Sequence, residues 1–177
     1  MKIFLLGMPG AGKTTLGSQI AEILSVSFLE LDQQIIEKEK LPIQDIFIQK
    51  GEDYFRQVES SLLKKLTLKH QDFVMSIGGG APCFYDNLEF MNQHGISLFI
   101  NVSFNELARR LSKSKKKRPL LYGIERDDFS GELKQKFQYR LPYYQKAQMV
   151  FQNDHLTPGE IIFKLRSLDY LKEKPKG

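Results

Sequence analysis

The chain has 177 residues, of which 41% are apolar and 27% charged, a composition typical of one globular domain. No apolar run approaches the roughly 18 residues that a membrane span requires, so we expect a cytoplasmic protein that does not span a membrane. The single cysteine, Cys83, excludes an internal disulfide and fits a reducing compartment. The net charge of +5 favours an anionic partner, which could be a phosphate, a carboxylate or a nucleic acid.

Short apolar runs alternate along the chain with segments of helical periodicity. No hairpin signal joins two neighbouring runs, so we expect parallel strands with helices on both faces of the sheet. This pattern predicts a three-layer α/β/α fold in one domain at 1–171, followed by a basic tail at 172–177. In chain order, the predicted strands are 2–6, 27–31, 73–77, 96–102 and 149–151.

Helices are predicted between these strands, where apolar residues recur three or four positions apart. We expect Gly51 to end the helical pattern that precedes it. Residues 157–160 read Thr-Pro-Gly-Glu, a capping box with proline at the first helical position, which begins a final helix that reaches about Leu171. The basic stretch 112–118 is expected to be a mobile loop. The helical segments lie around 16–24, 35–36, 43–47, 55–66, 106–111, 133–141 and 158–171.

A phosphate-binding loop is predicted at 7–14, where Gly-Met-Pro-Gly-Ala-Gly-Lys-Thr fills every fixed position of the Walker A pattern. It stands between a strand and a helix, so backbone N–H groups and the helix N-terminus can bind phosphate oxygens. We expect Lys13 to reach the β- and γ-phosphates, Thr14 to bind Mg²⁺, and Thr15 to lie near the α-phosphate. The loop predicts ATP as donor and leaves the acceptor open. The predicted ATP-binding residues of this loop are Gly10, Ala11, Gly12, Lys13, Thr14 and Thr15.

An acceptor site is expected at the carboxyl ends of the strands, where ligands bind in parallel sheets. Asp32 follows the second strand and could orient and deprotonate a hydroxyl group. The alternative for Asp32 is an N-cap of the following helix. Gly78, Gly79 and Gly80 follow the third strand, and without side chains their N–H groups can approach a substrate. The alternative for the three glycines is a tight turn.

Two arginines could bind a carboxylate on the acceptor, because the guanidinium fork matches a carboxylate with two parallel hydrogen bonds. They are Arg56, which points off the apolar face formed by Phe55 and Val58, and Arg140. A solvated surface arginine is the alternative for each. With Asp32 and the three glycines, the arginines predict a pocket for a small anionic alcohol.

These segments together resemble the shikimate kinase family, in the family's order and at its separations over nearly the whole chain. The combination is far more specific than the phosphate loop alone. The matching segments are the loop at 7–14, Asp32, Gly51-Glu52-x-x-Phe55-Arg56-x-x-Glu59, Gly78-Gly79-Gly80-Ala81, Arg118-Pro119-Leu120-Leu121 and Arg140-x-x-Tyr143-x-x-x-Ala147.

The resemblance implies a P-loop kinase fold with strand order 2-3-1-4-5. The implied reaction moves the γ-phosphoryl group of ATP to the 3-hydroxyl of shikimate, with Mg²⁺ as cofactor. Asp32 would hold the ring hydroxyls and act as base or orienting group, Arg56 and Arg140 would bind the carboxylate, and Glu59 would orient Arg56. The implied catalytic residues are Asp32, Lys13 and Arg118, and the implied shikimate-binding residues are Asp32, Arg56, Gly78, Gly79, Gly80 and Arg140.

A mobile lid at about 112–125 is also implied, with Arg118 closing over the phosphates as charge develops there. No residue aligns clearly with the arginine that stacks on adenine in the family. We choose Arg110, with Arg109 and Lys113 as alternatives.

Glu30 departs from the family, whose members usually carry aspartate at this position. Glutamate reaches one methylene further, and we expect it to contact Mg²⁺ through water.

Gluconate kinases and nucleoside monophosphate kinases share the loop and the fold but lack the combined triple-glycine and Arg-Pro-Leu-Leu pattern. A nucleotide-dependent nucleic-acid-binding protein would instead use the basic stretch to hold its ligand. The resemblance favours lysines that screen ATP phosphates or remain solvated. We therefore expect ATP and shikimate as partners, no nucleic acid, no membrane and a monomeric enzyme.

Overall fold

This computed structural model describes residues 1–113 and 129–171. Its strands form one five-stranded parallel sheet in the order β2-β3-β1-β4-β5, as predicted. The elements in chain order are β1 (Lys2–Leu6), α1 (Lys13–Leu24), β2 (Ser27–Glu30), α2 (Leu31–Glu39), α3 (Ile43–Lys69), β3 (Phe73–Ser76), the 3₁₀ turn η1 (Ala81–Cys83), α4 (Asn87–His94), β4 (Ile96–Asn101), α5 (Phe104–Lys113), α6 (Phe129–Tyr144), β5 (Met149–Gln152) and α7 (Pro158–Ser167).

The central strand β1 explains why the chain reads as continuous apolar runs rather than alternating ones. It pairs with β3 on one side and β4 on the other, and its residues Ile3, Phe4, Leu5 and Leu6 are fully buried. A parallel strand covered on both faces buries successive side chains in both directions. The ring of Phe4 meets that of Phe73 edge to face, with centroids 5.4 Å apart.

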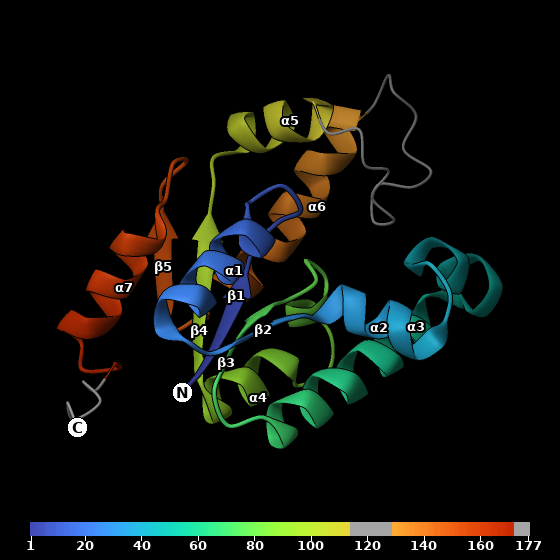
Figure 1. Ribbon diagram of the computed structural model, residues 1–177. Helices are drawn as coiled ribbons and strands as arrows, with labels where there is room; N and C mark the ends of the chain where they lie inside the picture. Colours follow the sequence, from blue (N-terminus) through green and yellow to red (C-terminus); the bar gives the residue numbers. More distant parts are fainter. Residues whose placement is uncertain (114–128, 172–177) are drawn as a thin grey trace.

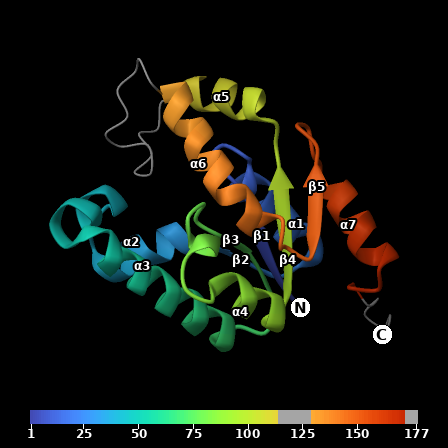
Figure 2. The same cartoon turned by 180° about the vertical axis from the view of Figure 1, so that it is seen from behind.

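Helices cover both faces of the sheet, which confirms the predicted three layers. Figure 1 shows α1 in front of the strands with α7 beside it, and Figure 2 shows α4 and α6 on the opposite face. The carboxyl ends of the strands point toward α5 in both views. The phosphate loop and the start of α2 both follow strands at this edge of the sheet.

Gly51 ends the helical stretch that precedes it, as predicted, and a second helical stretch follows within α3. Its φ of 82° and ψ of 169° are not helical, and helical residues resume directly after it. Glycine is required there because an L side chain rarely adopts a positive φ of this kind. The result is a kinked helix, whose second part carries Glu52, Arg56 and Glu59.

Several boundaries and two elements differ from the prediction: strand ends shift by one residue, and two helix ends shift further. Ser112 and Lys113, assigned to a loop, are the last residues of α5, and α7 ends at Ser167 rather than near Leu171. The turn η1 and the helix α4 were missed, because α4 is short and buries only two large apolar side chains, Leu88 and Met91. The capping box that begins α7 is confirmed: Thr157 and Glu160 exchange hydrogen bonds.

The predicted lid at 112–125 lies almost entirely outside the described residues, and so does the tail at 172–177. Within 1–113 and 129–171, no helix has the length and apolar character to cross a membrane. From β1 to α7, the described chain shares one continuous apolar core.

Candidate active site

The loop between β1 and α1 has the backbone conformation that phosphate binding needs. Gly7, Gly10 and Gly12 have φ angles of 144°, 89° and 91°, so the chain can turn its N–H groups inward. The buried Nζ of Lys13 donates to the carbonyl oxygens of Gly7 at 2.8 Å and Met8 at 3.1 Å. The ammonium group is therefore held against the loop, within reach of a bound phosphate chain.

A cavity of about 390 Å³ brings this loop together with predicted acceptor residues. Lys13 and Thr14 line it on the loop side, and Asp32, Gly78 and Gly79 line the other side. The second group lies at the start of α2 and just after β3, which meet the loop because β3 pairs with both β1 and β2. The cavity therefore joins a donor half to an acceptor half.

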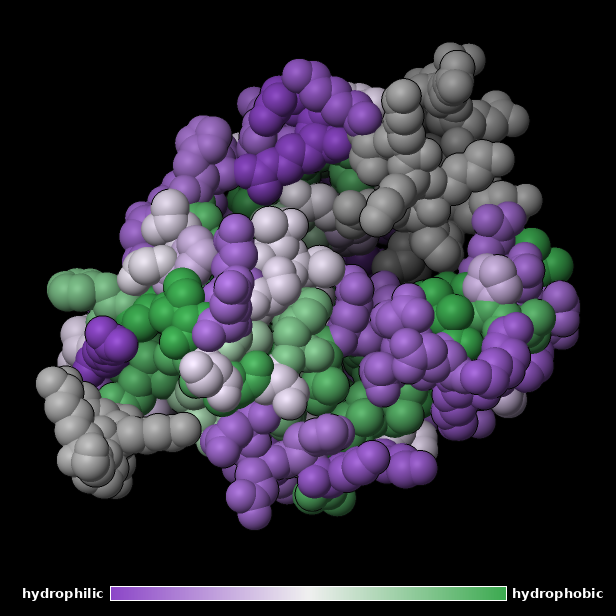
Figure 3. All heavy atoms as spheres, in the orientation of Figure 1, coloured by the Kyte–Doolittle hydropathy of each residue, from purple (hydrophilic) through white to green (hydrophobic). Residues whose placement is uncertain are grey.

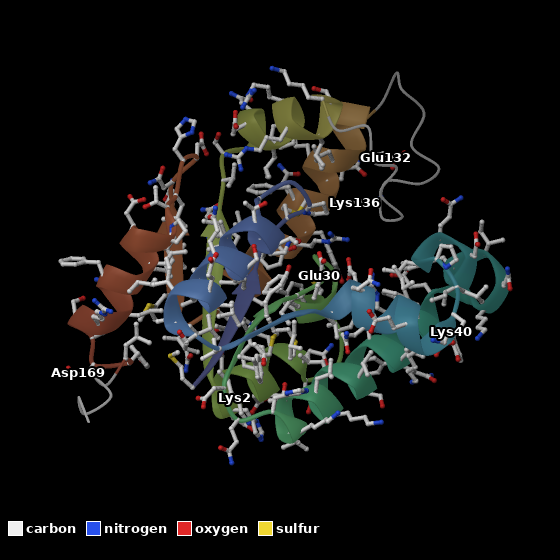
Figure 4. The ribbon with its side chains drawn as sticks, in the orientation of Figure 1. Lys2, Glu30, Lys40, Glu132, Lys136 and Asp169 are labelled. Atoms are coloured by element: carbon white, nitrogen blue, oxygen red, sulfur yellow. The ribbon has the colours of Figure 1, made fainter. Side chains whose placement is uncertain are left out.

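Glu30 lies directly beside Thr14, and both residues line this cavity. The Thr14 hydroxyl donates to Oε1 of Glu30 at 2.6 Å, and Figure 4 labels Glu30 where β2 passes into α2. A hydroxyl and a carboxylate are hard oxygen donors of the kind that Mg²⁺ prefers. Among residues 1–113 and 129–171, no group of three His, Cys, Asp or Glu side chains could hold a metal alone. Thr14 and Glu30 therefore fit a magnesium ion by the chemistry of their oxygen atoms.

Asp32 does not cap α2, so the alternative reading of this residue fails. The N-cap of α2 is Glu30, and Asp32 lies in the first helical turn. Its Oδ1 would be 2.7 Å from a Cβ placed on Gly78. The carboxylate thus faces the glycine segment and lines the cavity.

Arg56 is buried, with an exposed fraction of only 3%, and is not a solvated surface arginine. Its Nη1 donates to Glu59 at 2.7 Å, while Nε and Nη2 both donate to Oε1 of Glu52, at 3.1 and 3.0 Å. The ring of Phe84 lies over the guanidinium, 4.2 Å from Cζ. Two carboxylates and a ring therefore fix the plane of this guanidinium.

Arg140 is also buried and lines a second cavity of about 330 Å³ together with Arg56. Glu52, Phe84 and Lys136 share that lining, and Figure 4 labels Lys136 on α6. Two guanidinium groups around one cavity suit an anionic group such as a carboxylate.

Each of the three glycines after β3 packs against a different functional group that lines one of the two cavities. A Cβ on Gly78 would meet the carboxylates of Asp32 and Glu59, and one on Gly79 would lie 3.1 Å from Nη1 of Arg140. A Cβ on Gly80 would lie 2.6 Å from Nη2 of Arg56. The segment also turns, because the N–H of Ala81 donates to the carbonyl of Gly78. The glycine segment therefore both forms a turn and lets the side chains of Asp32, Arg140 and Arg56 approach its backbone closely.

Glu59 is a strongly perturbed carboxyl group at the site. Burial raises its pKa to about 7, against the opposing effect of the Arg56 guanidinium. Cys83 is nearby, and burial raises the pKa of its thiol to about 11. A thiol that stays protonated at neutral pH is a poor nucleophile.

Of Arg110 and Arg109, it is Arg110 that contacts the phosphate loop. Arg110 donates to the carbonyl oxygens of Gly10, at 3.3 Å, and of Asp154, and also to Glu106. Arg109 is half exposed and pairs with Glu106. Figure 3 shows hydrophilic side chains gathered over α5, the helix that carries both arginines. Lys113 ends that helix, and Arg118 lies outside the described residues.

Three contributors to the site were not predicted from sequence. Glu52 could have been found, because it stands four residues before Arg56 on one helix face. Phe84 gives no sequence signal. Tyr144 is a buried core residue whose hydroxyl donates to the carbonyl of Gly79.

The strand order, the phosphate loop and the adjoining acceptor cavity define the class of protein: a P-loop kinase that phosphorylates a small molecule. The family model for shikimate kinase matches residues 9–168. The chain belongs to the shikimate kinase family and is an ATP-dependent kinase.

Individual relatives agree with this assignment. A shikimate kinase from Bacteroides thetaiotaomicron is 43% identical over 156 residues, which cover 88% of this chain and 89% of the relative. A crystal structure of shikimate kinase from Bacteroides thetaiotaomicron superposes with a TM-score of 0.87 at 40% identity, covering 97% of this chain and 99% of that one. Shikimate kinase from Acinetobacter baumannii in complex with shikimate gives a TM-score of 0.85 at 32% identity, covering 97% and 95% of the two chains.

Proposed function

We propose that this chain transfers the γ-phosphoryl group of ATP to the 3-hydroxyl of shikimate, giving shikimate 3-phosphate and ADP. The observation that carries the proposal is the glycine segment after β3, against which Asp32, Arg140 and Arg56 each pack beside the phosphate loop. A base, two carboxylate-binding groups and a donor site thus surround one segment of backbone. A hydroxylated carboxylate is the substrate that uses all of them.

In the donor half, the loop amides and the N-terminus of α1 bind the phosphates of ATP. Lys13 leaves the carbonyl groups of Gly7 and Met8 and turns to the β- and γ-phosphates, since phosphate oxygens attract an ammonium group more strongly. Thr15, which lines the same cavity, lies near the α-phosphate. Arg110 contacts the adenine, and Arg118 of the lid neutralises charge on the transferring group.

The metal that we propose is Mg²⁺, held by the nucleotide phosphates and the Thr14 hydroxyl, with Glu30 acting through water. When bound, it supplies positive charge that offsets the negative charge of the phosphates.

In the acceptor half, Arg56 and Arg140 bind the shikimate carboxylate, and N–H groups of the glycine segment contact the ring substituents. The 3-hydroxyl oxygen attacks the γ-phosphorus while the bond to the bridging oxygen of ADP breaks. The hydroxyl proton passes to Asp32, whose carboxylate faces the same cavity as the loop. Closing of the lid at 112–125 would exclude water, the competing acceptor.

We also propose that the protein acts as a monomer in the cytoplasm, as one domain at 1–171, without binding nucleic acid. The shared apolar core from β1 to α7 supports the single domain. Sedimentation of the purified protein, with and without a labelled oligonucleotide, tests the monomer and the absence of nucleic-acid binding together.

A coupled ADP-release assay tests the reaction. Shikimate, gluconate and nucleoside monophosphates are offered side by side, with ATP and Mg²⁺ in excess. We expect turnover with shikimate alone. Turnover with gluconate or a nucleotide but not shikimate would overturn the proposal, and salt-sensitive oligonucleotide binding without turnover would favour the nucleic-acid alternative.

Asp32→Asn tests the base. The variant should lose most turnover while ATP still binds, because the amide keeps the shape of the side chain but cannot accept the hydroxyl proton. Asp53→Asn, at an exposed position on α3, is the control and should behave as wild type. A near-wild-type rate for Asp32→Asn would show that another group takes the proton.

A further inference from the structure

The hydroxyl of Tyr144 lies buried between the acceptor segment and the phosphate loop. It donates to the carbonyl oxygen of Gly79 at 2.5 Å and lies 3.7 Å from Sδ of Met8, a residue of the phosphate loop. The side chain is fully buried, and its ring packs on Phe99 with centroids 4.9 Å apart. A core side chain therefore reaches both halves of the active site through a single polar atom.

The three carbonyl groups of the glycine segment are all anchored. The carbonyl of Gly78 accepts from the N–H of Ala81 and that of Gly80 from the N–H of Cys83, both within the turn. The carbonyl of Gly79 accepts from the side chain of Tyr144 instead. Because glycine allows many backbone conformations, each anchor removes a rotation that the segment could otherwise make.

Anchoring the Gly79 carbonyl also orients the next N–H group. The peptide bond between Gly79 and Gly80 is trans, so the carbonyl and the Gly80 N–H point in opposite directions in one plane. Since the carbonyl points to buried Tyr144, the Gly80 N–H points away from it. Gly80 is the glycine that packs against the guanidinium of Arg56, the proposed carboxylate clamp.

Tyr144 also keeps its proton, which an anchor of this kind requires. Burial raises the pKa of the phenol well above its ordinary value, against the opposing effect of Arg140 one helical turn earlier. The hydroxyl therefore remains a donor at neutral pH.

We propose that Tyr144 is a positioning residue for the acceptor: through the Gly79 carbonyl it aims the Gly80 N–H at the bound acceptor and fixes the glycine segment against the phosphate loop. The inference rests on the proposed function, because it assigns an acceptor contact to that N–H group. Tyr144 itself touches neither substrate.

Tyr144→Phe removes the hydroxyl and keeps the ring in its place on Phe99. The expected result is a rise of about tenfold in the KM for shikimate, comparable to the loss of one hydrogen bond in a buried site. The KM for ATP should stay within about twofold, because the variant leaves the loop amides and Lys13 intact. Tyr54→Phe is the matched control: it loses a hydroxyl hydrogen bond to Glu39, at 2.9 Å, outside both cavities.

A merely structural role for Tyr144 gives a different result. Partial unfolding would lower the concentration of active enzyme and so the apparent kcat, with both KM values unchanged, and that outcome would overturn the proposal. So would equal rises in the two KM values. If wild type itself does not phosphorylate shikimate, the proposed function fails. If wild type is active and Tyr144→Phe keeps its shikimate KM, only the present inference fails.

A second measurement is made on wild-type protein, so it does not depend on how well Tyr144→Phe folds. In wild-type protein labelled with ¹⁵N-glycine, the Gly80 amide resonance should shift on titration with shikimate. Assignment uses Gly80→Ala, whose spectrum lacks that resonance. An unchanged Gly80 resonance at saturating shikimate would overturn the proposal without any Tyr144 variant.

Discussion

Gly80 packs directly against the guanidinium of Arg56, so closely that a Cβ on Gly80 would lie 2.6 Å from Nη2 and 2.7 Å from Nη1. The guanidinium has little freedom to retreat, because Glu59 and Glu52 hold its nitrogens and the ring of Phe84 covers its face. Arg56 can therefore occupy this position only because residue 80 has no side chain.

Gly80→Ala should therefore displace Arg56 and raise the KM for shikimate by about tenfold or more, with little change in the KM for ATP. The φ of −90° and ψ of −27° at Gly80 are accessible to alanine, so the effect is a steric one on the guanidinium. Gly159→Ala is the control, since the nearest atom to its Cβ would be 4.0 Å away. Steady-state kinetics with each substrate varied in turn make the measurement, and an unchanged shikimate KM would contradict the clamp.

Arg110→Ala should raise the KM for ATP by about tenfold and leave the KM for shikimate nearly unchanged, because Arg110 lies against the carbonyl of Gly10 in the donor loop. Arg109→Ala is the matched variant on the same helix, paired with the same Glu106, and should change the ATP KM by less than about twofold. Equal changes in the ATP KM for the two variants would contradict a contact between Arg110 and the nucleotide.

Glu30→Gln should raise the Mg²⁺ concentration that gives half-maximal activity by about tenfold, the usual effect of losing a residue that supports a metal ligand. Its carboxylate accepts from the Thr14 hydroxyl at 2.6 Å. Glu30→Asp restores the residue that the family usually carries and should stay close to wild type. Glu22→Gln, exposed on α1, controls for the loss of one surface charge. Identical magnesium dependence in Glu30→Gln and wild type would exclude Glu30 from the metal site.

The stability of wild type should fall as pH rises from about 5 to about 8, because Glu59 must ionise while buried. Its pKa is raised from 4.5 to about 7 in the folded protein, so between these values the folded state binds a proton that the unfolded state has lost. The contribution to the free energy of unfolding is fully present below 4.5 and lost as pH passes 7, with a size of about 3 kcal/mol.

Glu59→Gln, which resembles the protonated carboxyl group, should lack this slope and match wild type near pH 5. Urea unfolding at pH 5 and pH 8 measures the difference, with Glu89→Gln at an exposed position as control. Parallel stability curves for wild type and Glu59→Gln would show that Arg56 keeps Glu59 ionised throughout.

Much of the fold was predictable, because the signals that define it are local in the chain. The apolar runs at 2–6 and 96–102 are long enough to read as buried strands, and the Thr-Pro-Gly-Glu capping box at 157–160 satisfies the N-terminus of α7 within one turn. The misses have a physical cause too. Helix α4 carries too few apolar residues to show a period.

The amino-acid sequence by itself determined the donor half of this protein, since eight consecutive residues build the phosphate loop and need little from the rest of the chain. The acceptor half depended on contacts between distant segments. Whether Asp32 was a cap, whether Arg56 and Arg140 were solvated, and whether the glycines formed only a turn were all questions of burial and neighbours. Only the tertiary structure answered them, because it brings together α2, α3, α6 and the end of β3 and removes Arg56 and Glu59 from water.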